Sequence, residues 1–323
     1  MTTLALVPST PSTALYLPPL IAGAGDRAAL RFLEFFTVNI RNKNTRAAYG
    51  RAAADFLRWC EGQGIGELGR VQPVHVAAYI ELLQGRRSAP TVKQHLACIR
   101  MLFNWLVTGQ VMPSNPAHSV RGPRHSVSKG TTPVLCSEEA TALLTGMDVS
   151  TVVGLRDRAI IAVMTYTFAR VGAVVALSIE DYFSQKKRWW LRLREKNGKV
   201  NEMPCHHKLE DYLDAYIKAA GVADDRKGPL FRSAIGKTKQ LGPGAMSRTD
   251  VWYMVRRRAA GAGIETAIGC HTFRATGITD YLTNGGRIEV AQRMAGHSNA
   301  KTTGLYDRRN DDISVGDVER IGI

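Results

Sequence analysis

Apolar residues recur three or four positions apart through the first third of the chain. This spacing places them on one face of an α-helix and predicts four amphipathic helices, beginning near residues 28, 44, 73 and 90. Pro73 and Pro90 stand at the start of the last two, where a first helical turn accepts proline. Pro113 and Pro116 end the pattern. We therefore expect an all-helical domain over residues 26–118.

Two periodicities alternate in the rest of the chain. Helical spacing recurs six times, near residues 137–147, 154–168, 208–220, 247–261, 271–283 and 287–295. Residues 188–194 partly alternate instead, and residues 200–204 can pair with them across a turn containing Asn197-Gly198, a strong hairpin signal. The predicted fold class is mainly α (α+β): a helical N-terminal domain, then a mixed, mostly helical domain with a small antiparallel sheet.

Composition marks the segments outside these two domains. Residues 1–25 are rich in Pro, Thr and Ala and nearly uncharged, which is typical of a flexible tail, with 15–21 as one segment that can dock. Residues 119–135 combine Gly, Pro and Ser with three cations and no acid, the composition of a linker. The second domain then spans 136–310, and residues 311–323 form a C-terminal tail.

The net charge of +15 is unevenly spread. Residues 27–118 hold 12 Lys and Arg against 5 Asp and Glu, so with the linker they carry +10 of the +15 in about a third of the chain. This favours a polyanionic partner, nucleic acid or a membrane surface. Candidate phosphate contacts are Lys43, Arg46, Lys93 and Arg100 on the helices, where a solvated face is the alternative, and Arg121, Arg124 and Lys129 in the linker.

Cysteine usage and hydropathy bound the cellular context. The five cysteines contain no C-x-x-C pair, so we expect neither a disulfide framework nor a structural zinc site. Free thiols of this kind fit a reducing cytoplasm, which is the expected location. Residues 159–179 approach the length of a membrane span but include Arg170, which is costly at mid-membrane. We interpret them as two buried helical segments that meet at a break, with Arg170 at the junction and aimed into a cleft.

Several residues in the second domain are suited to phosphate chemistry. His271 and Arg274 are three positions apart and share one face of a predicted helix, where the guanidinium offers a planar fork to phosphate oxygens. Arg170 follows an apolar run and needs a partner. That partner is either a carboxylate, Asp157 or Asp181, or the phosphate of a substrate.

Three further residues complete the set. Gly296 suits a left-handed helix cap that turns His297 inward, although a histidine complementing the helix dipole is the alternative. Tyr306 is either a core tyrosine or a nucleophile whose phenolate is stabilised by neighbouring cations. Lys196, at the hairpin tip, can protonate a departing 5′-oxygen, and Lys199 is its rival.

Together these residues resemble the tyrosine recombinase (phage integrase) family. Ala169 to Gly172 is similar to the family's first-arginine box, 196–204 to its hairpin lysine segment, which favours Lys196, and 295–306 to its histidine–tyrosine box. The helical domain looks like the family's core DNA-binding domain, so the likeness covers roughly residues 27–310. One departure concerns a supporting carboxylate: the family often has a glutamate three residues after the first arginine, and here Ala173 stands, with Asp181 as the candidate replacement.

The resemblance implies a site-specific DNA recombinase that works through a 3′-phosphotyrosyl intermediate. Tyr306 would be the nucleophile, Arg170 and Arg274 would stabilise negative charge, His271 and His297 would bond phosphate oxygens, with His271 a base for the phenol, and Lys196 would protonate the leaving oxygen. No cofactor, metal or ATP is implied. The expected partners are double-stranded DNA at a specific site and three more protomers in a tetramer on paired sites, as in mobile-element integrases.

Other functions share these features. A type IB topoisomerase or a hairpin telomere resolvase would use the same site, and a catalytically silent DNA-binding regulator would use the same basic helices. The C-terminal tail carries apolar residues that can pack on a neighbouring protomer or equally on its own domain; they are Ile313, Val315, Val318 and Ile321.

Overall fold

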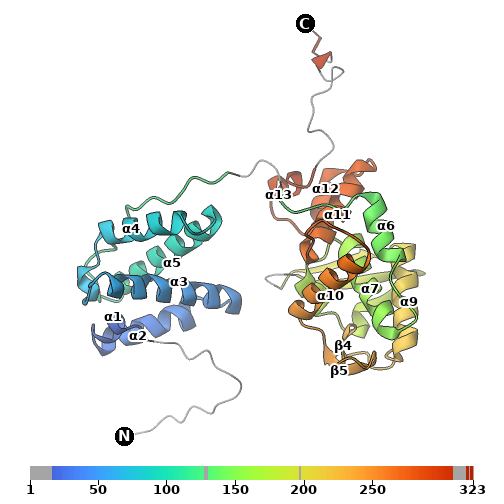
Figure 1. Ribbon diagram of the computed structural model, residues 1–323, viewed down its shortest axis with the longest axis horizontal. Helices are drawn as coiled ribbons and strands as arrows, with labels where there is room; N and C mark the ends of the chain where they lie inside the picture. The colour runs from blue at the N-terminus through green and yellow to red at the C-terminus, as the bar shows by residue number, and fades with distance from the viewer. Residues whose placement is uncertain (1–16, 127–129, 196–197, 308–317, 320, 323) are drawn as a thin grey trace. The chain divides into compact units, whose positions relative to one another are not determined.

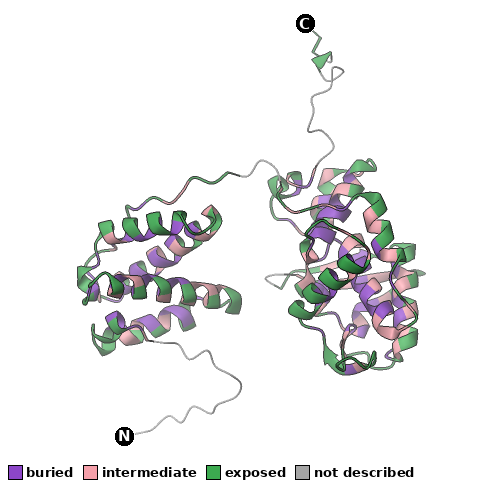
Figure 2. Ribbon diagram, viewed as in Figure 1, coloured by how far each residue is buried: buried purple, intermediate pink, exposed green. Residues whose placement is uncertain are grey.

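The computed structural model describes residues 17–126, 130–195, 198–307, 318–319 and 321–322. The chain divides into two compact units, residues 1–126 and 127–323 (Figure 1). In each, the buried residues line the faces of helices that pack together (Figure 2). This agrees with the predicted fold class, mainly α with a small antiparallel sheet.

The N-terminal unit is helical, and the four predicted helices are confirmed. Asn42 caps the second of them by accepting from the backbone N–H groups of Asn44 and Thr45. Their apolar faces build one core that includes Phe36, Phe56 and Phe103. The helices are α1 Pro19–Ala22, α2 Asp26–Glu34, the π-helical turn Phe35–Asn39, α3 Lys43–Gly62, the 3-10 turn Leu68–Arg70, α4 Pro73–Gln84 and α5 Ala89–Thr108.

The predicted tail over residues 1–25 is wrong for the part that the structure describes. Leu20 and Ile21 on α1 are buried in the core of the N-terminal unit, and the backbone N–H of Leu20 donates to Glu61. Burial of two large apolar side chains holds this short helix against the unit. The predicted docking segment at 15–21 therefore agrees with the structure in its described part. Residues 1–16 lie outside the described residues.

The predicted linker over 119–135 is shorter in the structure, because both of its ends pack. Val120 belongs to the core of the N-terminal unit, and Leu135 belongs to the core of the C-terminal unit. The backbone N–H of Leu135 donates to Thr276 at 3.0 Å. The division between the units falls inside the predicted range, between residues 126 and 127.

The C-terminal unit contains all six predicted helices and the predicted hairpin. Strands β2 and β3 pair antiparallel with Arg194 opposite Val200, and β1 adds to the far edge of β2. Elements that the sequence did not predict are the 3-10 turn at 179–181, α13, β1 and the β4–β5 pair. In order the elements are α6 Ser137–Thr145, α7 Val152–Tyr166, α8 Val171–Val174, the 3-10 turn Ile179–Asp181, β1 Tyr182–Gln185, β2 Arg188–Arg194, β3 Val200–Pro204, α9 His207–Ala220, β4 Arg232–Ala234, β5 Leu241–Ala245, α10 Arg248–Gly261, α11 Cys270–Thr283, α12 Ile288–Ala295 and α13 Ala300–Gly304.

Helix α7 lies at the centre of this unit and packs against α9 and α11 (Figure 1). Its residues 159–164 are all buried, which explains the apolar run in the sequence. The run breaks after Tyr166 and resumes with α8, as predicted. Among the helices of the described residues, none is long and apolar enough to cross a lipid bilayer.

Candidate active site

The break between α7 and α8 positions Arg170. Phe168 has φ of +55°, a left-handed conformation that is uncommon for a non-glycine residue and turns the chain sharply. Arg170 then occupies the N-cap position of α8 with an extended backbone. Its side chain is 41% exposed, and its Nη1 lies 2.6 Å from Oε2 of Glu195, whose side chain is only 6% exposed. Arg170 is thus a half-open cation held by a buried carboxylate.

Arg274 is the most enclosed charge of the site. The whole residue is 1% exposed, on helix α11 one turn after His271. Its Nη1 donates to the carbonyl of Phe168, and its Nη2 donates to the carbonyl of Ala295 at 2.5 Å. Its buried Nε has no hydrogen-bond partner in the part of the chain that the structure describes. Burial and then repulsion from Arg170 lower the pKa of Arg274 to about 10, so it remains charged at neutral pH.

The end of α12 places His297. Gly296 adopts the left-handed conformation, φ +61° and ψ +30°, and His297 turns inward to 8% exposure, as predicted. Its Nδ1 and the hydroxyl of Thr303 are 2.9 Å apart. Burial, followed by the charges of Arg274 and Arg170, lowers its pKa to about 4, so the imidazole is neutral at pH 7.

Tyr306 lies against both histidines. Its Oη is 2.8 Å from Nε2 of His271, and its ring stacks on the ring of His297 with centroids 5.8 Å apart and planes 8° apart. The backbone carbonyl of Tyr306 accepts from Thr279 of α11 at 2.9 Å, which ties the segment after α13 to the helix of His271 and Arg274. The whole residue is 8% exposed.

His271 has the electrostatics of a proton acceptor. Its pKa is lowered from the usual 6.5, first because the ring loses hydration beside Tyr306 and then because Arg274 and Arg170 repel a third positive charge. His271 itself is exposed, whereas Tyr306, which its Nε2 faces at 2.8 Å, is buried. At neutral pH this imidazole is therefore uncharged and within hydrogen-bond distance of a phenolic proton.

The structure brings together Arg170, His271, Arg274, His297 and Tyr306, five of the six predicted residues. The sixth, Lys196, lies outside the described residues. It directly follows Glu195, the partner of Arg170.

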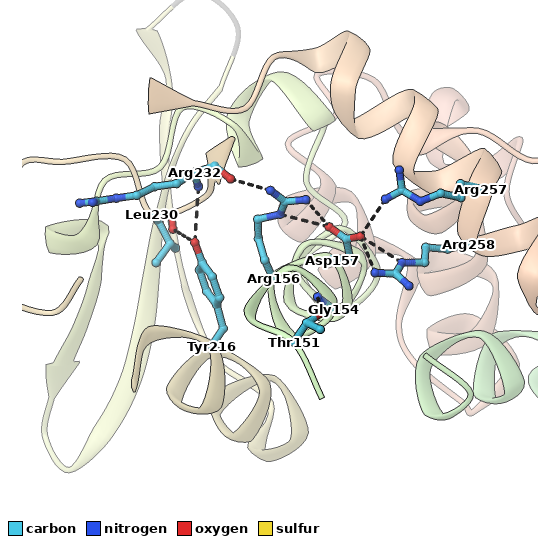
Figure 3. A network of polar contacts seen from close by, with 9 residues as sticks. All are labelled: Thr151, Gly154, Arg156, Asp157, Tyr216, Leu230, Arg232, Arg257 and Arg258. Carbon is cyan, nitrogen blue, oxygen red and sulfur yellow. Dashed lines mark hydrogen bonds and ion pairs between the residues drawn. The ribbon is translucent and has the colours of Figure 1, made fainter. Parts of the chain in front are cut away.

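The proposed carboxylate partners of Arg170 are wrong. Asp157 is fully buried, and its two oxygens accept instead from Arg156 at 2.7 Å, Arg258 at 2.8 Å and Arg257 at 3.2 Å, linking α7 to α10 (Figure 3). Asp181 accepts from the backbone of Ser178 at 3.0 Å and from Arg194 at 2.5 Å.

Glu195 holds Arg170 in their place and was missed. A signal for it exists in the sequence: it is the one acid of the segment 188–196, which holds Arg188, Arg192, Arg194 and Lys196. A lone acid at the end of a basic strand has several cations within reach, and the strand leads directly to the predicted site.

The predicted DNA contacts of the N-terminal unit divide into two groups. Arg46 donates twice to the carbonyl of Ile40, at 3.1 and 2.9 Å, and Arg100 donates to the carbonyls of Ala117 and Val120. These bonds tie both guanidinium groups to the backbone of their own unit, and DNA contact by either one stays a prediction. Four of the predicted cations are exposed, and the seventh, Lys129, lies outside the described residues; the exposed ones are Lys43, Lys93, Arg121 and Arg124.

Residues 133–312 match the phage integrase family, and residues 29–111 match the phage integrase N-terminal SAM-like domain. The tyrosine recombinase XerD of Listeria monocytogenes serotype 4b (strain F2365) is 26% identical over 278 residues, 85% of this chain and 91% of that protein.

Two solved structures share the fold. The XerH recombinase in a post-cleavage complex with a palindromic difH substrate has a TM-score of 0.67 at 18% identity and covers 81% of this chain and 75% of its own. A lambda integrase tetramer bound to a Holliday junction has a TM-score of 0.65 at 15% identity, covering 89% of this chain and 79% of that one.

The fold and the two family matches together define the chain as a DNA strand-transferring enzyme with a helical N-terminal domain. The chain belongs to the phage integrase family, the tyrosine recombinases.

Proposed function

We propose that the chain is a site-specific recombinase that cuts and rejoins double-stranded DNA through a 3′-phosphotyrosyl intermediate on Tyr306. The observation that carries this proposal is the 2.8 Å separation between Tyr306 Oη and His271 Nε2 in a cluster with two arginines. A phenol has an ordinary pKa of about 10 and attacks poorly unless a base takes its proton or cations stabilise the phenolate. Both kinds of group surround this one.

In the forward step, the oxygen of Tyr306 bonds to the scissile phosphorus and His271 takes the phenolic proton. The lowered pKa of His271 supports this role, because only the neutral imidazole can accept. The bond from phosphorus to the 5′-oxygen breaks, and Lys196 gives that oxygen a proton. One phosphodiester is exchanged for another, so attack by the 5′-hydroxyl of a second strand reverses the step without ATP or a metal.

The arginines and His297 stabilise the charge that develops on the phosphate. Arg274 is fixed by two backbone carbonyls, which leaves its buried Nε as a donor for a phosphate oxygen. Arg170 is partly open and can approach the same phosphate. With the hydroxyl of Thr303 donating to Nδ1 of His297, the proton of the neutral ring is on Nε2, which then donates to a phosphate oxygen.

Strand exchange needs two DNA sites, and we propose a tetramer on a pair of them. The lambda integrase tetramer on a Holliday junction has the same fold and supports this. The exposed cations Lys43, Lys93, Arg121 and Arg124 then contact the DNA backbone. Residues 311–323 pack on a neighbouring protomer; Val318 and Ile321 are 55% and 63% exposed in the single chain.

The test uses duplexes with a nick beside the scissile phosphate, selected from a random-sequence pool for covalent capture by the protein. After cleavage the short leaving fragment diffuses away, so the adduct accumulates and survives a denaturing gel. We expect an adduct with the wild-type chain and with Tyr281→Phe, a matched tyrosine on α11, and none with Tyr306→Phe. Absence of adduct with the wild type, or its persistence in Tyr306→Phe, contradicts the proposal.

A further inference from the structure

Glu195 stands out among the acids of the C-terminal unit because it is buried beside the candidate active site. Its side chain is 6% exposed, and it accepts from Arg170 at 2.6 Å. It comes from a different part of the fold, directly after β2, and is 25 residues away along the chain. A buried carboxylate of this kind is stable only with a partner, and here that partner is the exposed arginine of the site.

No other described acid takes this place. Helix α8, which begins directly after Arg170, is Val171–Val174 and offers no carboxylate. Asp181 is bound to Arg194 and Ser178, and Asp157 is bound to three other arginines. The orientation of Arg170 in the absence of DNA therefore depends on Glu195.

Two guanidinium groups share the site, and like charges repel. Arg170 lowers the pKa of Arg274, whereas Glu195 raises it, so the carboxylate offsets the repulsion between the two arginines. Without a counterion, the half-exposed Arg170 would turn toward solvent, because Arg274 is fixed by backbone carbonyls and cannot move. A phosphate arriving later would then have to order that side chain.

We propose that Glu195 is a positioning residue that holds Arg170 in the orientation the scissile phosphate requires, and so links this arginine to the β2–β3 hairpin. The inference rests on the proposed function. The hairpin is well suited to the task, since the backbone N–H of Glu195 donates to the carbonyl of Lys199 at 2.7 Å and Arg194 pairs with Val200. The strand that precedes Lys196 in the sequence thereby also sets the first arginine.

This role has a kinetic signature that a purely structural role lacks. Glu195→Gln removes a negative charge from a site that binds a phosphate, so DNA affinity should stay equal or rise. The same change frees Arg170, and misplacing a catalytic group by about 1 Å slows the chemical step by about 100-fold. Cleavage should therefore slow without any loss of DNA affinity.

The experiment measures DNA affinity at fixed salt and single-turnover cleavage of the captured duplexes for the full chain. Glu202→Gln is the matched control, since Glu202 lies on β3 of the same hairpin and pairs with Arg192 at 2.8 Å. We expect Glu195→Gln to cleave between about 10- and 100-fold more slowly with no loss of affinity. Glu202→Gln should match the wild type in both. Glu195→Asp, which keeps the charge on a shorter side chain, should cleave at an intermediate rate, and it decides the matter if the glutamine variant does not fold.

Three results would overturn the inference: wild-type cleavage by Glu195→Gln, equal losses in Glu195→Gln and Glu202→Gln, or loss of affinity in parallel with rate. If Glu195→Gln does not fold, wild-type cleavage by Glu195→Asp overturns it equally. All of these presuppose a wild-type adduct that needs Tyr306. Failure to form that adduct counts against the proposed function instead, so the two failures are distinguishable.

Discussion

Helices α7 and α11 approach closely at Gly277, so the loss of stability caused by Gly277→Ala can be predicted. A Cβ built on Gly277 would overlap the backbone carbonyl of Thr165 and lie 2.9 Å from Cδ1 of Phe168. A backbone carbonyl cannot rotate aside, so Gly277→Ala sits at the upper end of overpacking costs, about 3 kcal/mol. Alanine's better helix propensity returns about 1 kcal/mol. We expect a net loss of about 2 kcal/mol.

The same displacement should reach the active site. Phe168, whose carbonyl accepts from Arg274, is the residue that the new methyl group would push, and Gly277 is one turn after Arg274 on α11. Cleavage by Gly277→Ala should therefore fall even under conditions where the chain is folded. Gly304→Ala is the control, because that position is helical and has open space for a Cβ.

Hydrogen exchange measured by mass spectrometry reports the loss of stability separately for the C-terminal unit, which contains Gly277, and for the N-terminal unit. A loss of about 2 kcal/mol corresponds to about 30-fold faster exchange in peptides from α7 and α11. Peptides from α5, in the N-terminal unit, should be unchanged. Unaltered protection of α7 in Gly277→Ala would refute the reasoning, since it would mean that the two helices tolerate a methyl group between them.

Four further predictions concern charge and assembly. Single-turnover cleavage should hold its rate as pH falls to 6.5, the ordinary pKa of histidine, and decline only below it, because the lowered pKa keeps His271 neutral and able to accept a proton; a decline that begins above pH 6.5 argues against His271 as the base. Folding stability should fall over the same range, since the unfolded chain binds a proton at His297 near pH 6.5 whereas the folded chain resists it down to about pH 4; urea unfolding at several pH values measures this, and a slope of opposite sign contradicts it. Asp157→Asn should destabilise the C-terminal unit by about 3 kcal/mol, because Arg156 stays buried without its counterion, although the 62% exposed Arg257 adds little; unchanged exchange in α7 and α10 would count against it. Truncation after residue 310 should leave binding to one DNA site intact and abolish the tetramer on paired sites, as measured by light scattering, and a tetramer of the truncated chain rules out the tail's role.

The sequence was most informative where a local rule decides the outcome. Helical periodicity and proline positions placed α3, α4 and α5 within a few residues, and Asn197-Gly198 located the β2–β3 turn. Gly296 was predicted to adopt a left-handed cap and does, because only glycine adopts that conformation without strain. The spacing of Arg170, His271, Arg274, His297 and Tyr306 indicated the family, and the fold brings these residues together.

The choice of ionic partners was not predictable in this way. Asp157 and Asp181 were equally reasonable partners for Arg170 from the sequence, and both are bound elsewhere. Arg46 and Arg100 were expected to contact DNA but bond to backbone carbonyls of their own unit. A charged side chain at a given position has the same local signature whether it meets a phosphate, a carboxylate or a carbonyl.

The sequence alone determined the helices, the hairpin, the family and the chemical groups available to the site, since these depend on residue identity and on spacing along the chain. Only the tertiary structure decided which atoms of those groups meet: Tyr306 with His271, Arg274 with the carbonyls of Phe168 and Ala295, and Arg170 with Glu195. These pairings join elements 21 to 106 residues apart, and their geometry follows from how helices pack around α7, which no local pattern encodes.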